Sequence, residues 1–279
     1  MKKILFYMVV LFAVVAEAGY IKESVAAHKK GEHKKVASIY QKACDDGKSS
    51  ACYNLGVLYM GSKGIKKDPE KSIKYYKKAC DGNFSSACYN LAMIYQAGAI
   101  AKKDIQNAIK LYQKACESND GSACNNLGMI YANGIDIKKD QKKAVSYFKK
   151  SCNSFDNVGC SNLAYKYQHG EGVPKSYKQA YTLYKKSCGG GLAMACSNLG
   201  YLYEHGLGIK KSDKKASEYY KRACDGSYAR ACNNLAILYV NNKGVKKDLK
   251  KAQELFDKSC KLGLKTGCEN SKLLKGDES

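Results

Sequence analysis

The sequence predicts an all-α fold, an α/α solenoid in which 36-residue helical hairpins wind into a right-handed superhelix. The 14 cysteines form seven pairs, the members of a pair are eight residues apart, and each pair follows the last by 36 residues. A fixed period of roughly 20 to 50 residues is the signature of a solenoid, whose units bury their apolar faces only against their neighbours. Only 2 prolines occur in 279 residues, which argues against an all-β chain rich in turns.

The N-terminus has the three regions of a secretory signal peptide. Lys2 and Lys3 supply the positive charge, and an uncharged apolar run follows from Ile4 to Val15. Residues 16–18 read Ala-Glu-Ala, the small-x-small pattern that precedes a cleavage site. The apolar run is too short to span a hydrocarbon core of about 30 Å. We therefore expect residues 1–18 to be removed after Ala18, leaving a secreted or periplasmic protein without a membrane span.

The first helix of each repeat, helix A, is predicted from a stripe of leucine, a small residue and tyrosine. In the first copy these are Leu55, Gly56 and Tyr59. Residues four apart share one face of a helix, and the small residue lets a second helix approach closely. The leucine recurs as Leu91, Leu127, Leu163, Leu199 and Leu235, and the tyrosine as Tyr95, Tyr131, Tyr167, Tyr203 and Tyr239.

The second helix, helix B, begins in the first full copy at Asp68-Pro69. Aspartate is a good N-cap, and proline at the first helical position has no N–H to lose. The cap recurs as Asp104, Asp140, Ser176, Ser212 and Asp248. An aromatic residue marks the buried face of helix B at Tyr40, Tyr76, Tyr112, Phe148, Tyr184, Tyr220 and Phe256.

A glycine-containing loop joins helix A to helix B, for example Gly170 to Lys175, and its glycines are expected to take positive φ. Together the elements predict one solenoid domain over residues 19–279, opening with an N-terminal hairpin at 20–44 and ending with a closing helix at 267–275. Helices A and B of the repeats are expected at about 51–80, 87–116, 123–152, 159–188, 195–224 and 231–260.

The pattern Ala-x-x-x-Leu-Gly-x-x-Tyr, followed by Gly-x-Gly-Val-x-Lys-Asp and Tyr-x-Lys-Ala, resembles the SEL-one-like repeat over residues 32 to 268. This repeat is a 36-residue relative of the tetratricopeptide repeat. A cysteine pair in every repeat, together with the signal peptide, is similar to the cysteine-rich Hcp family of Helicobacter and related bacteria. The departures are small: Asn242 replaces the loop glycine, and Ile100 and Asp136 replace the second one.

Within this picture each cysteine pair is expected to form a disulfide, one per repeat. The first cysteine ends helix B and the second lies in the first turn of the next helix A, so antiparallel packing can bring their Cα atoms within about 4.4 to 6.8 Å. The expected bonds are Cys44–Cys52, Cys80–Cys88, Cys116–Cys124, Cys152–Cys160, Cys188–Cys196, Cys224–Cys232 and Cys260–Cys268. Metal binding is the alternative, but no Cys-x-x-Cys occurs and the 4 histidines have no useful spacing, so no metal or cofactor is expected.

One column fits no simple core role, because asparagine precedes the helix A leucine in every copy: Asn54, Asn90, Asn126, Asn162, Asn198 and Asn234, with Asn270 in the closing helix. The structural interpretation is that each amide caps a neighbouring loop or helix end, since Asn is unfavourable inside a helix unless it makes a hydrogen bond. The functional interpretation is a ladder that holds an extended peptide backbone, and the two are compatible. The resemblance supports the second, because helix A lines the concave groove of tetratricopeptide domains and an Asn at this position contacts bound peptide there.

The predicted groove also contains the neighbours of these asparagines. Tyr53, Tyr89, Asn125 and Asn233 lie one residue before the asparagine. Three residues after it lie Val57, Met93, Met129, Tyr165, Tyr201 and Ile237. Adaptable polar groups mixed with Tyr and Met suit protein recognition. We expect a monomer that binds a peptide or protein of the bacterial envelope or of a host, as an adaptor or interaction factor.

The net charge of +23 is spread over every repeat, and one lysine column recurs in the A–B loop as Lys67, Lys103, Lys139, Lys175, Lys211 and Lys247. A solvated outer face that keeps the chain soluble is the simplest interpretation. Salt-dependent attraction to acidic lipid, polysaccharide or protein is the alternative. No nucleic-acid motif is present, and export makes such a partner unexpected.

The resemblance also implies an alternative function, because the Hcp family carries a β-lactamase label. Ser-x-x-Lys occurs at Ser146/Lys149 and at Ser212/Lys215, residues 265–267 read Lys-Thr-Gly, and Ser-Asp-Asn is absent. In serine β-lactamases the Lys-Thr-Gly triplet lies on a strand facing the nucleophile. A linear solenoid gives groups more than one repeat apart no way to converge, so these matches are interpreted as coincidence. A weak penicillin-binding or β-lactam-hydrolysing activity stays the second hypothesis.

Overall fold

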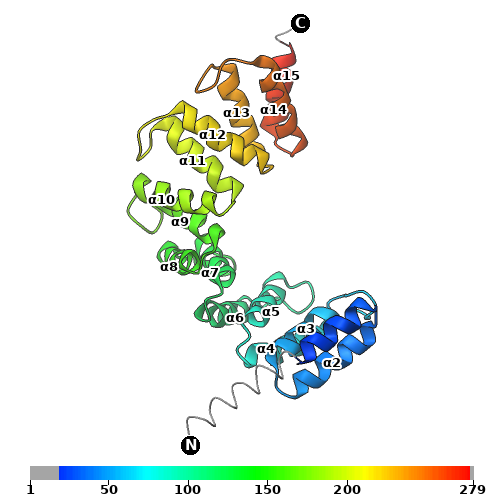
Figure 1. Cartoon of the computed structure of the whole chain (residues 1–279). Helices are drawn as coiled ribbons and strands as arrows, with labels where there is room; N and C mark the ends of the chain where they lie inside the picture. Colours follow the sequence, from blue (N-terminus) through cyan, green and yellow to red (C-terminus); the bar gives the residue numbers. More distant parts are fainter. Residues whose placement is uncertain (1–18, 277–279) are drawn as a thin grey trace, which may run out of the picture. The chain divides into compact units, whose positions relative to one another are not determined.

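The computed structural model describes residues 19–276, and the regular structure in this range is entirely helical (Figure 1). Helices alternate with short turns and longer loops in the 36-residue rhythm of the sequence. The predicted all-α class and the hairpin repeat are confirmed. The predicted signal peptide, residues 1–18, lies outside the described residues.

The described residues form two compact units, the first ending at Leu127 and the second beginning at Gly128. The first holds a helix over residues 19–29, then α2 (His33–Asp45), α3 (Ser49–Tyr59), α4 (Pro69–Asp81), α5 (Ser85–Ala97) and α6 (Ile105–Glu117). Helix α7 (Gly121–Asn133) begins in the first unit and ends in the second. The second continues with α8 (Gln141–Asn153), α9 (Asn157–His169), α10 (Tyr177–Gly189), α11 (Ala193–His205), α12 (Asp213–Asp225), α13 (Ala229–Val240), α14 (Leu249–Lys261) and α15 (Lys265–Gly276).

The odd-numbered helices from α3 to α15 are helix A of the repeat, and the even-numbered helices from α2 to α14 are helix B. Each predicted hairpin contains such a pair, and the closing helix α15 begins at Lys265, two residues before the predicted start. Because residues 19–276 form two compact units, a single domain over residues 19–279 and a right-handed superhelix stay predictions.

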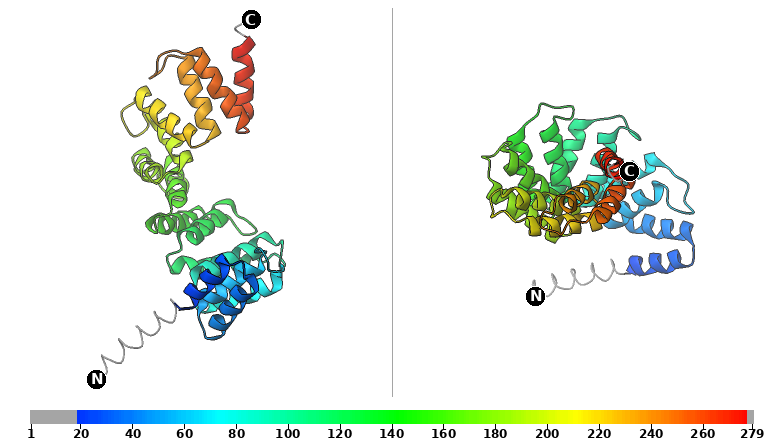
Figure 2. Two further views of the ribbon diagram at one scale, coloured as in Figure 1. Left: turned by 45° about the vertical axis from the view of Figure 1, so that its right-hand side comes forward. Right: turned by 90° about the horizontal axis from the view of Figure 1, so that it is seen from above.

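Packing within each unit follows chain order. From α2 to α6, and again from α8 to α15, each helix packs on the next one along the chain (Figure 2). In the second unit helix A also contacts the following helix A, α11 with α13 and α13 with α15. This nearest-neighbour packing is that of a solenoid.

The predicted caps begin each helix B. Asp68 accepts a hydrogen bond from the Lys71 backbone N–H at 3.0 Å, with Pro69 at the first helical position. The same geometry recurs at Asp104, Asp140, Ser176, Ser212 and Asp248. These oxygens satisfy backbone donors that a helix N-terminus leaves without a partner.

Two of the three loop residues that depart from the repeat pattern, Asn242 and Asp136, keep its backbone geometry. Gly170 ends α9 with φ of 73°. Asn242, which replaces this glycine, has φ of 55°, and Asp136, which replaces the second glycine, has φ of 52°. Asparagine and aspartate tolerate this left-handed region better than most residues do. The loop is therefore preserved in both repeats.

The core of each repeat is the leucine of helix A packed with the aromatic ring of helix B. Leu55, Leu127 and Leu199 are fully buried, as are Tyr112, Phe148, Tyr184 and Tyr220. The small residue after the leucine faces the ring, since a Cβ added at Gly128 would lie 2.5 Å from the Phe148 ring. This close approach confirms the predicted role of the small position.

All seven predicted disulfides are present within residues 19–276. Their Cα–Cα distances lie between 4.4 and 4.8 Å, and each bond ties the end of one helix B to the first turn of the next helix A. No free cysteine occurs in this part of the chain.

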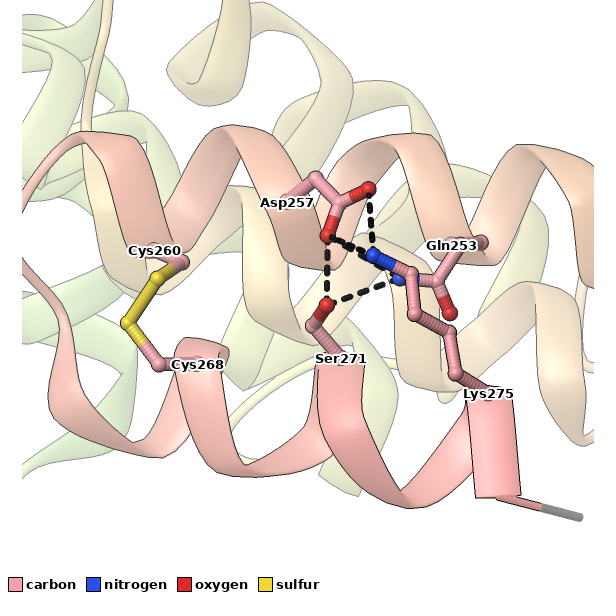
Figure 3. Close-up of polar contacts among 6 residues, drawn as sticks. All are labelled: Gln253, Asp257, Cys260, Cys268, Ser271 and Lys275. Carbon is pink, nitrogen blue, oxygen red and sulfur yellow. Dashed lines mark hydrogen bonds and ion pairs between the residues drawn. A yellow bond between two sulfur atoms is a disulfide. The ribbon is translucent and has the colours of Figure 1, made fainter.

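The closing helix α15 is held on α14 by a polar network centred on Asp257 (Figure 3). The Asp257 carboxylate accepts hydrogen bonds from the Ser271 hydroxyl and, at 3.0 Å, from the Gln253 amide. The Lys275 ammonium lies 3.3 Å from the same carboxylate. These bonds and the Cys260–Cys268 disulfide fix the end of the second unit.

Candidate functional site

The asparagine column lies along helix A at the border between the core and the surface, and every member is half-buried. Asn126 shows what these amides do. Its Nδ2 donates to the Tyr112 hydroxyl at 3.2 Å, and this hydroxyl in turn donates to Gln96 Oε1 at 2.8 Å. Burial raises the pKa of Tyr112 to about 12, while the hydrogen bond from Asn126 acts in the opposite direction. The amide is thus joined to a buried phenol of the preceding helix B.

The same pairing recurs in two other repeats. Burial raises the pKa of Tyr76 and of Tyr220, and hydrogen bonds from the side chains of Asn90 and Asn234 oppose these rises. The Tyr220 hydroxyl also donates to the Glu204 carboxylate at 2.7 Å. In these three repeats the amide therefore contacts a phenol oxygen and not the loop or helix end that the sequence suggested.

The fourth tyrosine of this kind is incompletely satisfied. Burial raises the pKa of Tyr184 and the Asn198 amide opposes the rise, but the Tyr184 hydroxyl makes no hydrogen bond of normal geometry. Gln168, which occupies the position of Gln96 and Glu204, likewise has a buried Oε1 without a hydrogen bond. This repeat therefore lacks the acceptor contact that Tyr112 and Tyr220 have.

Where phenylalanine replaces tyrosine on helix B, the asparagine has another neighbour. Opposite Phe148 the Asn162 amide lies 3.8 Å from the Met129 sulfur. After Phe256 the Asn270 amide donates to Asn233 Oδ1 at 2.8 Å. In these repeats the amide contacts the adjacent helix A.

An exposed apolar column lies three residues after the asparagines. We call it the helix A stripe; it consists of Val57, Met93, Met129, Tyr165, Tyr201, Ile237 and Leu273. All except the half-buried Ile237 are 38% to 68% exposed. Six of the twelve exposed large apolar residues in the described chain therefore lie in one column of the repeat.

Two histidines extend this stripe in the second unit. His169 lies against Tyr165 and His205 against Tyr201, with ring centroids 4.2 and 4.1 Å apart. Both pairs are spaced i, i+4 on helix A, which is the spacing that brings side chains together on one face. In the second unit the stripe therefore combines aromatic rings with the polar nitrogens of the two histidines.

The stripe of the second unit ends in an apolar pocket of about 250 Å³. Its lining consists of Ile237, Val240, Asn241, Phe256, Asn270, Leu273 and Leu274. The sequence predicted only a closing helix here, and the pocket itself was not predicted. The signal was Leu273, which occupies the stripe position of α15 and is the most exposed member of the column.

The predicted groove residues that precede the asparagines are less exposed than the stripe. Tyr53 packs on Tyr76 and Phe84, with centroids 5.8 and 4.9 Å away, and Tyr89 packs on Tyr112 at 5.8 Å. Asn233 is buried. Tyr53 and Tyr89 are thus half-buried against neighbouring rings, while Tyr165 and Tyr201 are exposed.

Basic residues near the end of helix B have a structural role that the sequence did not reveal. Lys186 Nζ donates to the Cys152 carbonyl at 3.0 Å, and Arg222 to the Cys188 carbonyl at 2.8 Å. Each bond reaches the helix B of the preceding repeat, where cations stabilise a helix C-terminus. A lysine or arginine occupies this position at 78, 114, 150, 186, 222 and 258.

One lysine is buried in the core face of helix A. Lys166 occupies the position of Leu58, Ile94, Ile130, Leu202 and Leu238. Its Nζ lies 2.6 Å from the Glu171 carboxylate and 2.7 Å from Gln141 Oε1. The hydrogen bond from Lys166 holds the pKa of Glu171 below its usual value. Lys166 thus joins helix A to the following loop through Glu171 and to the preceding helix B through Gln141.

The residues of the Ser212 and Lys265 motifs belong to helix N-termini. Ser212 is the N-cap of α12 and accepts a hydrogen bond from the Lys215 backbone. Residues 265–267 form the first turn of α15, a helix and not a strand, and Lys265 lies 3.7 Å from Glu269. Among residues 19–276 no group of three or more His, Cys, Asp or Glu side chains could hold a metal ion.

Disulfides form and persist mainly outside the cytoplasm, so the bonded cysteines indicate an extracytoplasmic protein. In the described part of the chain no helix has the length and apolar character needed to cross a bilayer.

Comparison with known proteins gives consistent results. A curated relative is HcpE of Helicobacter pylori, named as a candidate beta-lactamase, which is 43% identical over 42 residues, 15% of this chain and 12% of that protein. The match thus spans about an eighth of the relative's length. A Sel1 repeat protein from Oxalobacter formigenes superposes with a TM-score of 0.76 at 30% identity, over 86% of this chain and 99% of that one. The protective antigen c5321 of uropathogenic Escherichia coli, which has an SLR fold, gives 0.78 at 25% identity, over 83% of this chain and 50% of that one.

The Sel1 repeat model matches six consecutive segments, at residues 49–84, 85–120, 121–154, 158–192, 193–228 and 229–264. These segments cover more than half of the chain and coincide with the helical hairpins described above. The chain therefore belongs to the Sel1 repeat family.

Proposed function

We propose that this protein is an exported, disulfide-stapled repeat protein that binds a peptide or protein along helix A, acting as an adaptor or as an envelope or host interaction factor. The observation that carries this proposal is the helix A stripe, one apolar side chain per repeat three residues after a half-buried asparagine, exposed in every copy except at Ile237. Apolar side chains that gather on one exposed face of a protein mark interaction sites.

The asparagines support this role through their position and remaining capacity. Asn126 donates one N–H to Tyr112, while an amide offers two donors and an oxygen with two acceptor sites. Because the phenol fixes the side chain, the other N–H and the oxygen can bind a peptide backbone without first losing rotamer freedom. The core contact and the binding role are therefore compatible.

The second unit supplies the better anchors. Tyr165 and Tyr201 are 45% and 40% exposed, and the apolar pocket beyond them can take one side chain. Tyrosine is enriched among residues that dominate binding energy. We therefore expect the peptide to contact α9, α11, α13 and α15.

The test is a peptide selected from a displayed random 12-residue library on the wild-type protein. Tyr165→Ser with Tyr201→Ser should weaken its binding at least tenfold, measured by calorimetry. The matched control, Lys178→Ser with Lys214→Ser, changes exposed residues of helix B in the same repeats and should leave the dissociation constant unchanged. Equal affinity in both variants, with unchanged circular dichroism, would contradict the proposal.

A further inference from the structure

A second interaction surface is indicated by one residue that breaks the pattern of the repeats. The turn between helix B and the next helix A contains a residue with positive φ in every copy. It is glycine, asparagine or serine at Gly47, Asn83, Asn119, Gly191, Ser227 and Gly263. In the turn between α8 and α9 it is Phe155, with φ of 60°. A bulky side chain in this region is a conformational outlier.

Nothing in the fold compensates for this strain by burying the ring. Phe155 is 84% exposed, more than any other large apolar residue of the described chain. Three residues later Val158, 39% exposed, stands where the first unit has Ser50, Ser86 and Ser122. An unfavourable residue that contributes nothing to the core is expected where function requires it.

The backbone of the turn that carries Phe155 is held in place by several contacts. Asp156 caps α9 by accepting from the Val158 N–H at 3.0 Å and from the Ser151 hydroxyl at 2.7 Å. The Asn157 amide donates to the Gly190 carbonyl at 3.1 Å, and the Cys152–Cys160 disulfide closes the loop. A backbone that is already fixed lowers the entropic cost of binding at this position.

The surroundings of the ring are basic. Lys186 lies over it, with Nζ 5.5 Å from the centroid, and is held there by the Cys152 carbonyl. Exposed lysines also occur in the last turns of the two B helices of this region, at positions 149 and 150 of α8 and at position 185 of α10. Asn153 replaces the carboxylate that follows the first cysteine at Asp45, Asp81, Glu117 and Asp225. The Asp156 carboxylate is occupied by the helix cap.

We propose that Phe155 and Val158 form a docking site for an acidic protein segment, whose apolar side chains pack on the ring while its carboxylates meet the surrounding lysines. Charge complementarity selects this partner, and a buried aromatic residue with a polar rim is the usual form of a binding hot spot. Phe155 lies on the disulfide turn and Val158 in the first turn of α9, seven residues before the stripe residue Tyr165. The proposal does not depend on the function proposed for the stripe.

The test begins with a displayed random 12-residue library, selected on the full disulfide-bonded chain and counter-selected on Phe155→Asn. Peptides that distinguish the two should combine Asp or Glu with apolar residues. For a synthetic peptide of this kind, Phe155→Asn should lower the affinity at least tenfold, and raising the salt concentration should weaken binding further. Leu262→Asn, an exposed apolar residue in the last such turn, and Tyr201→Ser in the stripe should have no effect.

A second readout separates this role from a structural one. Because asparagine tolerates the left-handed region, Phe155→Asn should raise Tm by about 2 to 4 °C while binding is lost. A lower Tm, or a library without distinguishing peptides, would overturn the proposal. So would sedimentation of the wild type, but not of Phe155→Asn, with phosphatidylcholine vesicles containing phosphatidylglycerol, since the site would then bind a membrane.

Discussion

At the scale of single residues, the sequence showed which positions are constant in the repeat, but it did not show which side chains they contact. The asparagine column was visible at once as a constant of the repeat. Its partner, the phenol of the preceding helix B, could not be predicted, because it depends on how two helices a dozen residues apart are rotated against each other. The chain nevertheless contains a natural test of the pairing, since Phe148 and Phe256 lack the hydroxyl and their asparagines have other neighbours.

Two tyrosines at the same repeat position should respond differently to loss of the hydroxyl. Tyr112→Phe removes a group that donates to Gln96 and accepts from Asn126, so the free energy of unfolding should fall by about 1 kcal/mol. Tyr184→Phe removes a buried hydroxyl without a hydrogen bond and should leave stability unchanged or slightly higher. Urea denaturation of both variants measures this difference, and equal losses would refute the assigned contacts.

The buried Lys166 should matter for stability chiefly through its partner. Lys166→Leu restores the residue type found in the other repeats, and should leave stability unchanged or raise it by about 1 kcal/mol. Glu171→Gln leaves a buried ammonium without its counter-charge and should cost about 1 to 3 kcal/mol. Lys251→Leu, in an exposed pair with Glu254, serves as the control and should change stability by less than about 0.5 kcal/mol. A large loss for Lys166→Leu would show that the ion pair itself stabilises the fold.

At the scale of elements, the sequence was sufficient to predict nearly every feature of the single hairpin. Period, caps, loop glycines and disulfide pairs were all predictable, because each shows as a residue type that recurs at one position of the repeat. The polar network of the closing helix was not, since Asp257 meets Ser271 and Lys275 only after α14 and α15 have packed. The pocket beside Leu273 was missed for the same reason.

The closing helix should loosen in acid. The Ser271 hydroxyl, followed by Lys275 and Gln253, holds the pKa of Asp257 below its ordinary value of 3.8. A carboxyl group with a lowered folded pKa contributes stability above its unfolded pKa and loses it as pH falls through the folded value. We expect proteolysis within α15 to accelerate below about pH 4. Asp257→Asn should be cut faster at pH 7 and show a weaker pH dependence, whereas an unchanged profile would contradict this assignment.

Each disulfide should stabilise its own hairpin junction. A bond that closes nine residues contributes about 2.6 kcal/mol in the chain-entropy model. Replacing Cys224 and Cys232 by serine should therefore lower the free energy of unfolding by about that amount, and exchange of backbone amides should rise first at the α12–α13 junction. Uniform loss of protection over the second unit would instead indicate that the repeats unfold as one.

At the scale of the whole molecule, family membership could be read from the sequence, whereas the arrangement of the repeats and the partner could not. The Sel1 repeats identify each hairpin, and each unit by itself contains members of the helix A stripe. The basic residues near the end of helix B were not singled out in the sequence, yet Lys186 and Arg222 hold neighbouring repeats together.

The β-lactamase label of HcpE can be tested directly on this protein. Ser212 is a helix cap and residues 265–267 begin a helix, so we expect no hydrolysis of nitrocefin above the buffer rate. Turnover by the pure protein that disappears in Ser212→Ala or Lys265→Ala would show that a catalytic site exists.

The claim that binding occurs along helix A is tested most directly by placing a photo-crosslinking amino acid at single positions of the full chain. Positions 165 and 201 of the stripe should crosslink to a biotinylated peptide selected on the wild type, while positions 178 and 214 on helix B should not. Crosslinks that arise only from helix B, or equally from all four positions, would contradict the account.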